Sequence, residues 1–348
     1  MSTYDRIADL DVTIETVERR RYVARTTSDF ERTTTEFRLS GDGVVGRGED
    51  VTYETADHDA LVGTDPIDLE GAWTVDGLSA HLADVDLFAA RPPEREGSRR
   101  YRRWAIESAA LDLGLRQAGE TLGERLGIEP DPVRFVVSTR LGDPPTIDRV
   151  TELLEADADL EFKLDPTPEW PEDLFVALRE TEAIRVLDLK GWYEGTEVDV
   201  TADPELYRDV LAAFPAAVVE DAAFTPETTP LLKPQADRLA FDYPIDGVES
   251  LRSLPVDPGW GNVKPSRFGS LESLFETIDY CDREGITMYG GGQFELASGR
   301  THVQTLAALW YPDAPNDVAP GAFNDPDADP PYPSSPLRPD GDAVGFDY

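Results

Sequence analysis

Cysteine is nearly absent from this sequence, which has a single one, Cys281, in 348 residues. One thiol excludes a disulfide framework and any metal site built from several cysteines. Histidine is also scarce, with three residues, and no apolar run approaches the length of a membrane span. The start, MSTYDRIADL, lacks the basic and apolar regions of a signal peptide. We therefore expect a soluble, cytoplasmic protein.

Positive charge is scarce as well. The chain has 32 Lys and Arg residues against 70 Asp and Glu residues, and its formal net charge is -38. Such a chain would be repelled by nucleic acids and by anionic membranes, so neither is an expected partner. The acidic residues are spread along the whole chain and are not gathered in one tail. This pattern predicts a protein adapted to concentrated salt, from a halophilic source.

Lysine is the scarcer of the two basic residue types, with only four of the 32 basic residues. If a high-salt solvent has removed lysine from the surface, the remaining lysines are expected where an amine is needed. Lys163, Lys190 and Lys264 each stand at the end of an apolar, strand-like run. Lys233 lies in the loop-like sequence LLKPQ, and we expect it on a solvated surface.

Short apolar runs that lead into charged residues recur along the second half of the chain. Each is typical of a buried parallel strand, and helix-like segments separate them. In an alternating β/α chain the carboxyl ends of the strands face one mouth, where barrel enzymes keep their active sites. A chain of this length also exceeds what one core usually organises. The runs are at 160–165, 184–191, 216–221, 238–242 and 260–264.

The chain is expected to divide into three parts. Residues 1–130 predict an α+β domain, with a hairpin at Gly41-Asp42-Gly43 and a buried helix over Arg102 to Leu126 that stops at Gly127. Residues 131–315 predict the barrel, from a first strand at 134–138 to a last one at 286–289. Residues 316–348 are rich in Pro, Asp and Gly. This tail is either an ordered wrap toward the first domain or disordered.

Three carboxylates form the most informative constellation. Asp188, Glu220 and Asp242 end three consecutive predicted strands, so they are expected to converge in the mouth of the barrel. They would repel one another there unless a hard divalent cation lay among them, Mg²⁺ by preference and Mn²⁺ as an alternative. With 70 acidic residues in the chain, any single one could stand at a strand end by chance. Their joint placement with Lys163 and Lys264 favours a metal site.

The order KxD, DLK, VVED, AFD, NVKPSRFG, GGQFE resembles the enolase superfamily, and within it the branch of the muconate lactonizing enzyme. The resemblance extends to the first domain, where GDGVVGRGE is similar to the hairpin of the family's capping domain. It implies a modified TIM barrel, (β/α)7β, with an N-terminal α+β capping domain and an active site between them. It also implies a homo-oligomer, between a dimer and an octamer.

The resemblance assigns roles to individual residues. Asp188, Glu220 and Asp242 match the family's metal ligands, and Lys264 matches the lysine after the sixth barrel strand, which serves as base or acid. Lys163 matches the first lysine of the KxK pair, which helps to hold the substrate carboxylate, and Glu295 matches the acid near the end of the seventh strand. We further expect contacts with the substrate from three residues, namely Arg140, Asn262 and Gln293.

Two positions depart from the family pattern. The second lysine of KxK, a general base in many members, is Asp165 here, and the Asn of the DxN motif is Lys190. Lys190 either replaces the missing amine from the neighbouring strand or forms an ion pair with Asp165 that only neutralises two buried charges. No His-Asp dyad is visible, because His58, His81 and His302 lie outside the strand ends.

The chemistry that suits such a site is removal of a proton α to a carboxylate. The product carries a second negative charge, which a divalent cation and lysines can compensate. The sequence therefore predicts a Mg²⁺-dependent isomerase or lyase acting on a small organic acid, with racemisation, dehydration, cycloisomerisation and β-elimination all open. A metabolite-binding pseudoenzyme is the alternative, because the KxK base is lost. Specificity is expected from the loops at 21–32 and 139–143.

Overall fold

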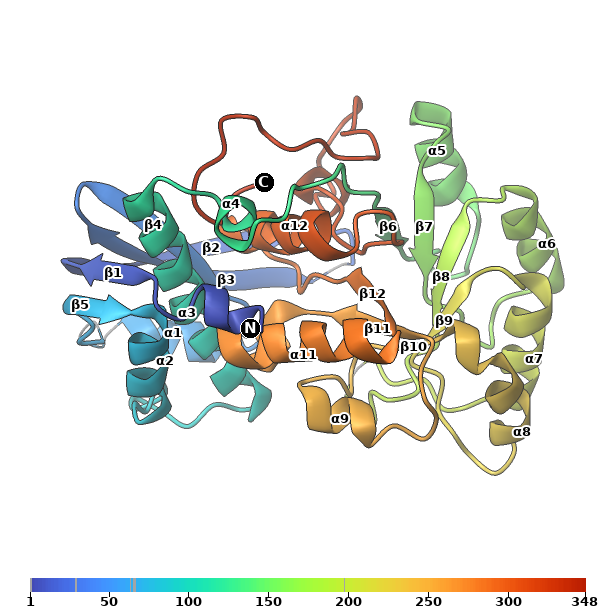
Figure 1. Ribbon diagram of the computed structural model, residues 1–348. Helices are drawn as coiled ribbons and strands as arrows, with labels where there is room; N and C mark the ends of the chain where they lie inside the picture. Colours follow the sequence, from blue (N-terminus) through green and yellow to red (C-terminus); the bar gives the residue numbers. More distant parts are fainter. Residues whose placement is uncertain (1, 29, 63, 65–66, 197) are drawn as a thin grey trace.

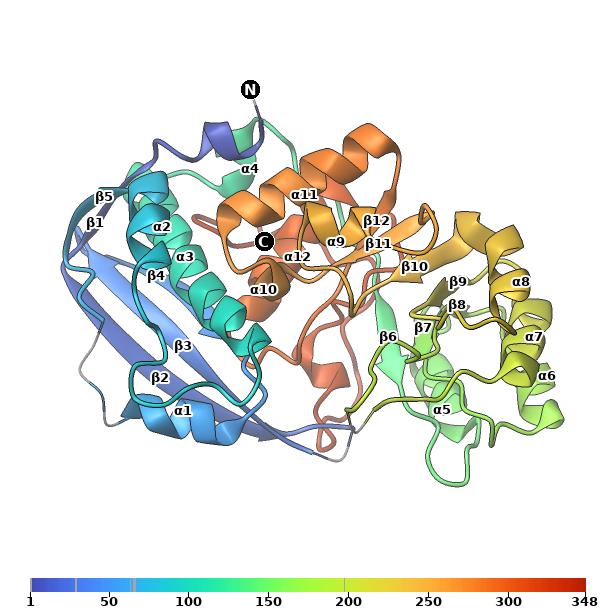
Figure 2. The same cartoon turned by 90° about the horizontal axis from the view of Figure 1, so that it is seen from below.

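An antiparallel cap and a curled parallel sheet make up the fold of the computed structural model (Figure 1). The structure describes residues 2–28, 30–62, 64, 67–196 and 198–348. Figure 2 shows cap strands β2, β3 and β4 with helix α3 on one side of the molecule, the parallel strands on the other, and α10 and α11 between them. Among the described helices, none is both long and apolar enough to cross a membrane.

The cap contains two antiparallel sheets. The predicted hairpin is confirmed, because Asp42 and Gly43 have φ of 52° and 78°, as a two-residue turn of this kind requires. Gly48 lets β4 approach α3 closely, since a Cβ atom there would lie 2.0 Å from the carbonyl oxygen of Ala105. The strands are β1 (Asp11–Ile14), β2 (Thr16–Arg25), β3 (Glu31–Gly41), β4 (Val44–Asp50) and β5 (Gly71–Thr74), and the helices are α1 (Thr55–Val62), α2 (Val75–Ala83), α3 (Gly97–Ala118) and α4 (Leu122–Leu126), preceded by a 3-10 turn, η1 (Tyr4–Arg6).

The long helix expected over 102–126 is wrong in its extent. The structure has two helices there, because Gly119 adopts φ of 72° and ends α3. Thr121 and Glu124 then form a capping box that starts α4, which stops at Gly127 as predicted. The α3 helix also begins five residues earlier than expected, at Gly97. This earlier start brings its first turn to the rim of the barrel.

Seven parallel strands form the curled sheet, in the order of the chain. This arrangement confirms the predicted alternation of strands and helices, and the helical segment over 229–238 is a short α-helix continued by a 3-10 helix. The strands are β6 (Val136–Thr139), β7 (Glu161–Leu164), β8 (Ile184–Asp188), β9 (Val218–Glu220), β10 (Leu239–Phe241), β11 (Trp260–Val263) and β12 (Thr287–Gly290). The helices are α5 (Asp148–Ala156), α6 (Glu172–Glu180), α7 (Pro204–Ala213), α8 (Thr229–Leu232), η2 (Lys233–Arg238), α9 (Val248–Arg252), α10 (Pro265–Phe268), α11 (Leu271–Glu284), α12 (Ser298–Trp310) and η3 (Gly321–Phe323).

Two residues close the gap between the first and last barrel strands. Asn316 forms a parallel bridge with Phe135, and Asp317 forms one with Gly291. The amide of Val136 donates to the carbonyl oxygen of Asn316 at 2.8 Å. Both residues were expected to belong to the C-terminal tail, 316–348. They take the place of an eighth strand, which is too short to carry a periodic pattern.

The rest of the C-terminal segment is ordered and wraps back to the cap. Phe346 is fully buried and stacks on His302 of α12, with ring centroids 4.3 Å apart. The carbonyl oxygen of Gly345 accepts the amide of Leu122 at 3.1 Å, and Asp347 pairs with Arg116 of α3. The last residues therefore join the cap to the barrel.

Candidate active site

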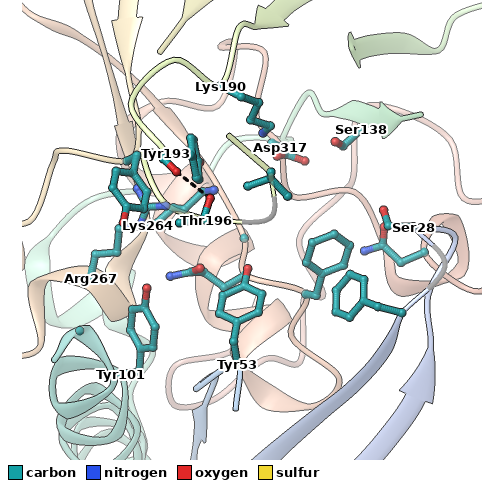
Figure 3. A pocket seen from close by; sticks show the side chains of 18 of the residues that line it. Ser28, Tyr53, Tyr101, Ser138, Lys190, Tyr193, Thr196, Lys264, Arg267 and Asp317 are labelled. Carbon is teal, nitrogen blue, oxygen red and sulfur yellow. Dashed lines mark hydrogen bonds between the residues drawn. The ribbon is translucent and has the colours of Figure 1, made fainter. Parts of the chain in front are cut away.

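A cavity of about 880 Å³ lies between the cap and the carboxyl ends of the barrel strands. Figure 3 shows Tyr53 and Tyr101 rising from the cap toward Lys190 and Lys264 of the barrel. The stretch expected to be a specificity loop, 21–32, is largely strand, and Ser28 and Phe30 at its tip line the cavity. Asp29, in the same stretch, lies outside the described residues.

Four carboxylates lie buried beneath this cavity. Asp188 and Glu220 end β8 and β9, and Asp242 directly follows β10, as predicted. The oxygens of Asp188, Glu220 and Asp221 lie within 4.8 Å of one another, and this group can hold a metal ion. Asp242 turns instead toward Lys264 Nζ at 2.8 Å and Arg267 Nη1 at 2.7 Å.

Asp221 is the carboxylate that sequence reasoning missed. Successive residues of a strand point to opposite faces, so strand alternation alone would turn the residue after Glu220 away from the mouth. Asp221 has φ of 51°, a left-handed conformation that turns its side chain inward. Its two oxygens accept the amides of Asp242 and Tyr243, both at 2.9 Å. The carboxylate therefore also fixes the end of β10.

Negative charge is in excess around these carboxylates. Burial raises the pKa of Glu220 well above its usual range, against the attraction of Lys163. Burial and the charges of Asp242 and Asp188 raise the pKa of Asp221 to about 7. Among the described residues, six acidic side chains of the cluster face four basic ones. They are Asp165, Asp188, Glu220, Asp221, Asp242 and Asp317, against Lys163, Lys190, Lys264 and Arg267.

The six acidic side chains exceed the four basic ones by two negative charges. A divalent cation bound to the buried carboxylate oxygens would neutralise this excess. Magnesium takes oxygen ligands and needs neither histidine nor thiolate, which this cluster lacks among its described side chains. Asp188 and Glu220, with Asp221 or Asp242, therefore fit the ion in their chemistry.

Lys163 is committed to holding carboxylates. Its ammonium contacts Glu220, and it lies 3.2 Å from Asp188 Oδ2 and 3.6 Å from Asp317 Oδ2. Burial would lower the pKa of Lys163, but the charges of Glu220 and Asp188 outweigh it and raise the pKa well above the ordinary value. In this arrangement the ammonium of Lys163 is held among three carboxylates.

Lys264 follows β11 and is the N-cap residue of α10. Its Nζ donates to Asp242 Oδ2 at 2.8 Å, and its side chain lines the cavity. Asn262, two residues earlier, is buried, and both atoms of its amide lack a hydrogen-bond partner in the described part of the chain. The backbone of Gly291 packs on both, since a Cβ atom there would lie 2.3 Å from Asn262 Oδ1 and 2.6 Å from Lys264 Cε.

Lys190 and Asp165, the two positions that depart from the family pattern, both line the cavity. Their positions are compatible with Lys190 replacing the missing amine and with an ion pair between the two residues. Lys190 Nζ contacts Asp188 and lies 3.6 Å from Asp165 Oδ1. Its side chain points into the cavity beside Asp317 (Figure 3). Burial raises the pKa of Asp165 despite the charge of Lys190. An amine in the mouth and an ion pair with Asp165 are therefore both present.

Of the other predicted residues, Arg140 and Gln293 line the cavity, whereas Glu295 is buried and does not. The side-chain amide of Gln293 donates to Ser266 Oγ at 3.2 Å, and its backbone amide donates to Glu295 Oε1 at 2.7 Å. The second oxygen of Glu295 lies 3.1 Å from Arg300 Nη2. Arg140 lines the cavity and donates to the carbonyl oxygen of Ser28 at 3.5 Å.

Three contacts to the buried carboxylates were not predicted. The hydroxyl of Tyr193 donates to Asp242 Oδ2 at 3.0 Å, and that of Tyr289 donates to Glu220. Arg267 pairs with Asp242. Arg267 belongs to the motif NVKPSRFG and could have been found there. Tyr193 comes from the loop after β8, where the sequence carries no pattern that would single it out.

The chain is similar to several known proteins. Two family models match the chain, Domain of unknown function (DUF8230) N-terminal domain over residues 5–125 and Domain of unknown function (DUF8230) C-terminal domain over residues 129–325. A curated relative, the N-succinylamino acid racemase of Thermus thermophilus, is 26% identical over 233 residues. The match covers 62% of this chain and 58% of that protein, so the chain spans little more than half of the relative's length.

Solved structures show the same fold. An enolase superfamily member from Listeria innocua superposes with a TM-score of 0.67 at 17% identity, covering 91% of this chain and 88% of that one. A dipeptide epimerase from Methylococcus capsulatus, solved with a Mg ion, superposes with a TM-score of 0.66 at 20% identity, covering 87% and 89%. The expected fold, a capping domain with a modified TIM barrel, is confirmed.

Proposed function

The chain belongs to the family described as Domain of unknown function (DUF8230), and from this premise we propose that it is a metal-dependent enzyme. Its proposed reaction removes the proton α to a carboxylate of a small organic acid. The observation that carries this proposal is that one cavity is lined by lysine amines and lies over a buried carboxylate cluster that can hold a divalent ion. The named relatives, a racemase and an epimerase, are enzymes whose reactions fit this class.

The charge of the cavity wall supports an anionic substrate. Basic residues are outnumbered two to one in the whole chain, yet the described residues of the wall include eight basic and only four acidic ones. With a divalent ion bound among the carboxylates beneath it, such a wall would attract a carboxylate into a molecule that otherwise repels it. The basic residues are Arg95, Arg100, Arg140, Lys163, Lys190, Lys264, Arg267 and Arg300, and the acidic ones are Glu54, Asp165, Asp246 and Asp317.

Asp188 and Glu220, together with Asp221 or Asp242, would hold the ion, Mg²⁺ by preference or Mn²⁺. When bound, the ion supplies positive charge against the second negative charge that α-proton removal creates. The chain's own contribution is the buried position of these carboxylates, which are at most 1% exposed. Lys163 adds a fixed positive charge on the same group.

Lys264 is the proposed base. Among the described carboxylates, Lys163 contacts three, Lys190 contacts two and Lys264 contacts one. The amine of Lys264 is therefore the least committed to neutralising acidic groups, and it opens directly on the cavity. A general base must reach the proton that it removes, and Lys264 meets this condition for a substrate in the cavity.

Proton exchange in D₂O tests the proposal. The protein, with Mg²⁺ and concentrated KCl, would be incubated with N-succinyl amino acids, dipeptides and simple carboxylates, and exchange of the α proton followed by NMR. We expect exchange that needs the metal and is abolished in Lys264→Met. Lys233→Met is the matched control, because Lys233 is an exposed lysine outside the cavity. Exchange that survives in Lys264→Met would overturn the role of this residue.

A non-catalytic metabolite-binding protein is the second candidate. It is favoured by one observation, the aspartate at position 165, whose ion pair with Lys190 needs no catalytic role. In that case carboxylates would bind in a Mg²⁺-dependent way, measured by calorimetry, and no ligand would exchange its α proton.

A further inference from the structure

Tyr53 is a phenol of the cap that the proposed chemistry does not use. It belongs to the loop between β4 and α1, and its side chain rises from the cap into the cavity (Figure 3). The side chain is 38% exposed, and its hydroxyl makes no hydrogen bond to the described residues. The hydroxyl can therefore donate to a ligand in the cavity.

The position of this phenol is fixed by a buried arginine. Arg32 is 1% exposed, and its guanidinium carbon lies 4.4 Å from the centre of the Tyr53 ring. Arg32 in turn donates to the carbonyl oxygen of Thr52 at 2.7 Å and to that of Gln293 at 3.1 Å. One side chain thus ties the Tyr53 ring to the cap and to the barrel loop after β12. A catalytic group needs such a fixed position, because small displacements cost much of its effect.

The charges around Tyr53 make it a proton donor and not a base. Loss of water contact inside the cavity raises the pKa of Tyr53, against the charges of Arg32 and Lys264. The phenol therefore keeps its proton at neutral pH. The same two cations, together with Arg267, would stabilise the phenolate that remains after the proton has been donated.

The acceptor that fits this hydroxyl is an uncharged oxygen. A second carboxylate would be repelled, because Glu54 of the same wall pairs with Arg95 through one oxygen only and its Oε2 has no partner among the described side chains. A cationic group would face the charges of Lys264 and Arg267, which both act on Tyr53. A hydroxyl group carries no charge and accepts a hydrogen bond, so it meets both conditions.

We propose that Tyr53 is the general acid of the reaction and that the substrate carries a hydroxyl group on the carbon next to the α carbon. Resting on the proposed function, this makes the reaction a dehydration. Lys264, from the barrel side, removes the α proton, and the electron pair of the C–H bond forms a double bond. The bond from the neighbouring carbon to the hydroxyl oxygen breaks, and Tyr53 donates its proton to this oxygen, so that water leaves. The proton on Lys264 then returns to the Tyr53 phenolate through solvent.

Matched pairs of substrates test this role. The probes are β-hydroxybutyrate and β-hydroxyhexanoate with their β-chloro counterparts, incubated with Mg²⁺ and concentrated KCl in D₂O and followed by NMR. A hydroxyl group must be protonated to leave, whereas chloride leaves without a proton. In Tyr53→Phe, which keeps the ring, loss of water from the hydroxy acids should therefore fall by roughly 10²- to 10⁴-fold. Loss of chloride and exchange of the α proton should stay at the wild-type rate.

Binding supplies a readout that needs no turnover. By isothermal titration calorimetry with Mg²⁺, β-hydroxybutyrate should bind the wild type roughly two- to tenfold more tightly than butyrate, as one net hydrogen bond predicts. Tyr53→Phe should bind the two acids equally. Tyr280→Phe is the matched control, because Arg252 lies over the Tyr280 ring at 5.2 Å but this tyrosine is outside the cavity. The control should keep both the preference and the rate of dehydration.

The two proposals fail separately. If the α proton exchanges but the wild type releases no water from a hydroxy acid, or Tyr53→Phe releases it at the wild-type rate, the enzymatic function stands and the acid role falls. Equal loss of the water and chloride reactions in Tyr53→Phe would show that the phenol only shapes the cavity, which also overturns the acid role. If no probe exchanges its α proton, the enzymatic function falls and the acid role with it, whatever the binding preference.

Discussion

At the scale of single residues, the exchange of Asp165 and Lys190 decides the chemistry of the mouth. The sequence predicted both side chains in the mouth because they follow neighbouring strands, and the structure places both at the cavity. The sequence could not decide whether Lys190 replaces the missing amine or only pairs with Asp165. That choice depends on which carboxylates the Lys190 amine contacts. Lys190 also has φ of 53°, which no sequence pattern indicated.

Replacing Lys190 and Lys264 by methionine separates the possible reactions. Loss of a general acid or base lowers kcat by roughly 10²- to 10⁴-fold, so Lys264→Met should be nearly inactive. If Lys190 replaces the missing amine, the kcat of Lys190→Met should be lowered by a similar factor, measured on the substrate found by proton exchange. A Lys190→Met enzyme with full turnover would indicate a one-base site. Such a site suits elimination or cycloisomerisation, because racemisation needs a proton donor on the opposite face.

The third metal ligand can be assigned by single substitutions. Asp221 lies in the compact carboxylate group, whereas Asp242 matches the family pattern but faces Lys264 and Arg267. At a free Mg²⁺ concentration about 100 times its Kd, binding should stabilise the wild type by about 2.7 kcal/mol. Thermal melting with and without Mg²⁺ should show that Asp188→Asn and Glu220→Gln are no longer stabilised by Mg²⁺. Of Asp221→Asn and Asp242→Asn, the variant that removes the third ligand should lose this stabilisation as well.

A stabilisation that survives in the triple variant Asp188→Asn, Glu220→Gln, Asp242→Asn and also in Asp221→Asn would rule out a metal site at these carboxylates. Concentrated KCl should weaken the effect without abolishing it, because buried charges are screened less than exposed ones.

At the scale of elements, the sequence predicted most strands and helices because each barrel strand is an apolar run that ends on charge. Its errors lie where single backbone conformations decide. Gly119 divides the long helix, Asp221 turns its side chain inward, and the two residues 316–317 close the barrel. None of these features has a period that a sequence pattern could reveal.

One contact between elements joins the cap to the loop that carries Gln293 and Glu295. Glu49, at the end of β4, is fully buried and accepts the amides of Leu296, Ala297 and Gly299 at 2.7 to 3.0 Å. These amides start helix α12, so a residue of the cap acts as the N-terminal cap of a barrel helix. The contact fixes the loop at the rim of the cavity.

Glu49→Gln should therefore destabilise the protein by about 1–3 kcal/mol, because a charged acceptor of three hydrogen bonds becomes a neutral one. Chemical denaturation would measure the loss. Glu18→Gln, an exposed glutamate on β2, is the control and should change stability by less than about 0.5 kcal/mol. Equal stability of Glu49→Gln and Glu18→Gln would show that the cap does not hold the loop through this carboxylate.

At the scale of the whole molecule, the C-terminal segment couples cap and barrel through a buried histidine. His302 stacks on Phe346, and neither ring nitrogen has a hydrogen-bond partner in the described part of the chain. Burial lowers the pKa of His302 to about 4, from an ordinary value of 6.5. The folded state therefore favours the neutral ring, whereas the unfolded chain takes up a proton below pH 6.5.

The contribution of neutral His302 to the free energy of unfolding should therefore be fully present above pH 6.5 and be lost as the pH decreases from 6.5 toward 4. The contribution of His302 to this loss is about 3 kcal/mol, from the pKa difference between the two states. His302→Phe, which cannot be protonated, should be less sensitive over this interval when unfolding is measured by denaturant titration at several pH values. An identical pH dependence in both proteins would exclude His302 as the titrating group.

The net charge of -38 acts on the molecule as a whole, and lowering the salt concentration should reveal it. The Debye length is about 3 Å in 1 M salt and about 30 Å at 0.01 M, so dilution exposes the carboxylates on the surface to one another. Their repulsion should lower the melting temperature steadily between molar and millimolar KCl at constant Mg²⁺.

The same field should weaken the binding of an anionic ligand at low salt, even though the cavity wall is basic, because the long-range repulsion of the whole molecule is then unscreened. A melting temperature that does not depend on KCl would contradict the halophilic interpretation of the composition, and with it the inference that Lys163, Lys190 and Lys264 remain because the site needs amines.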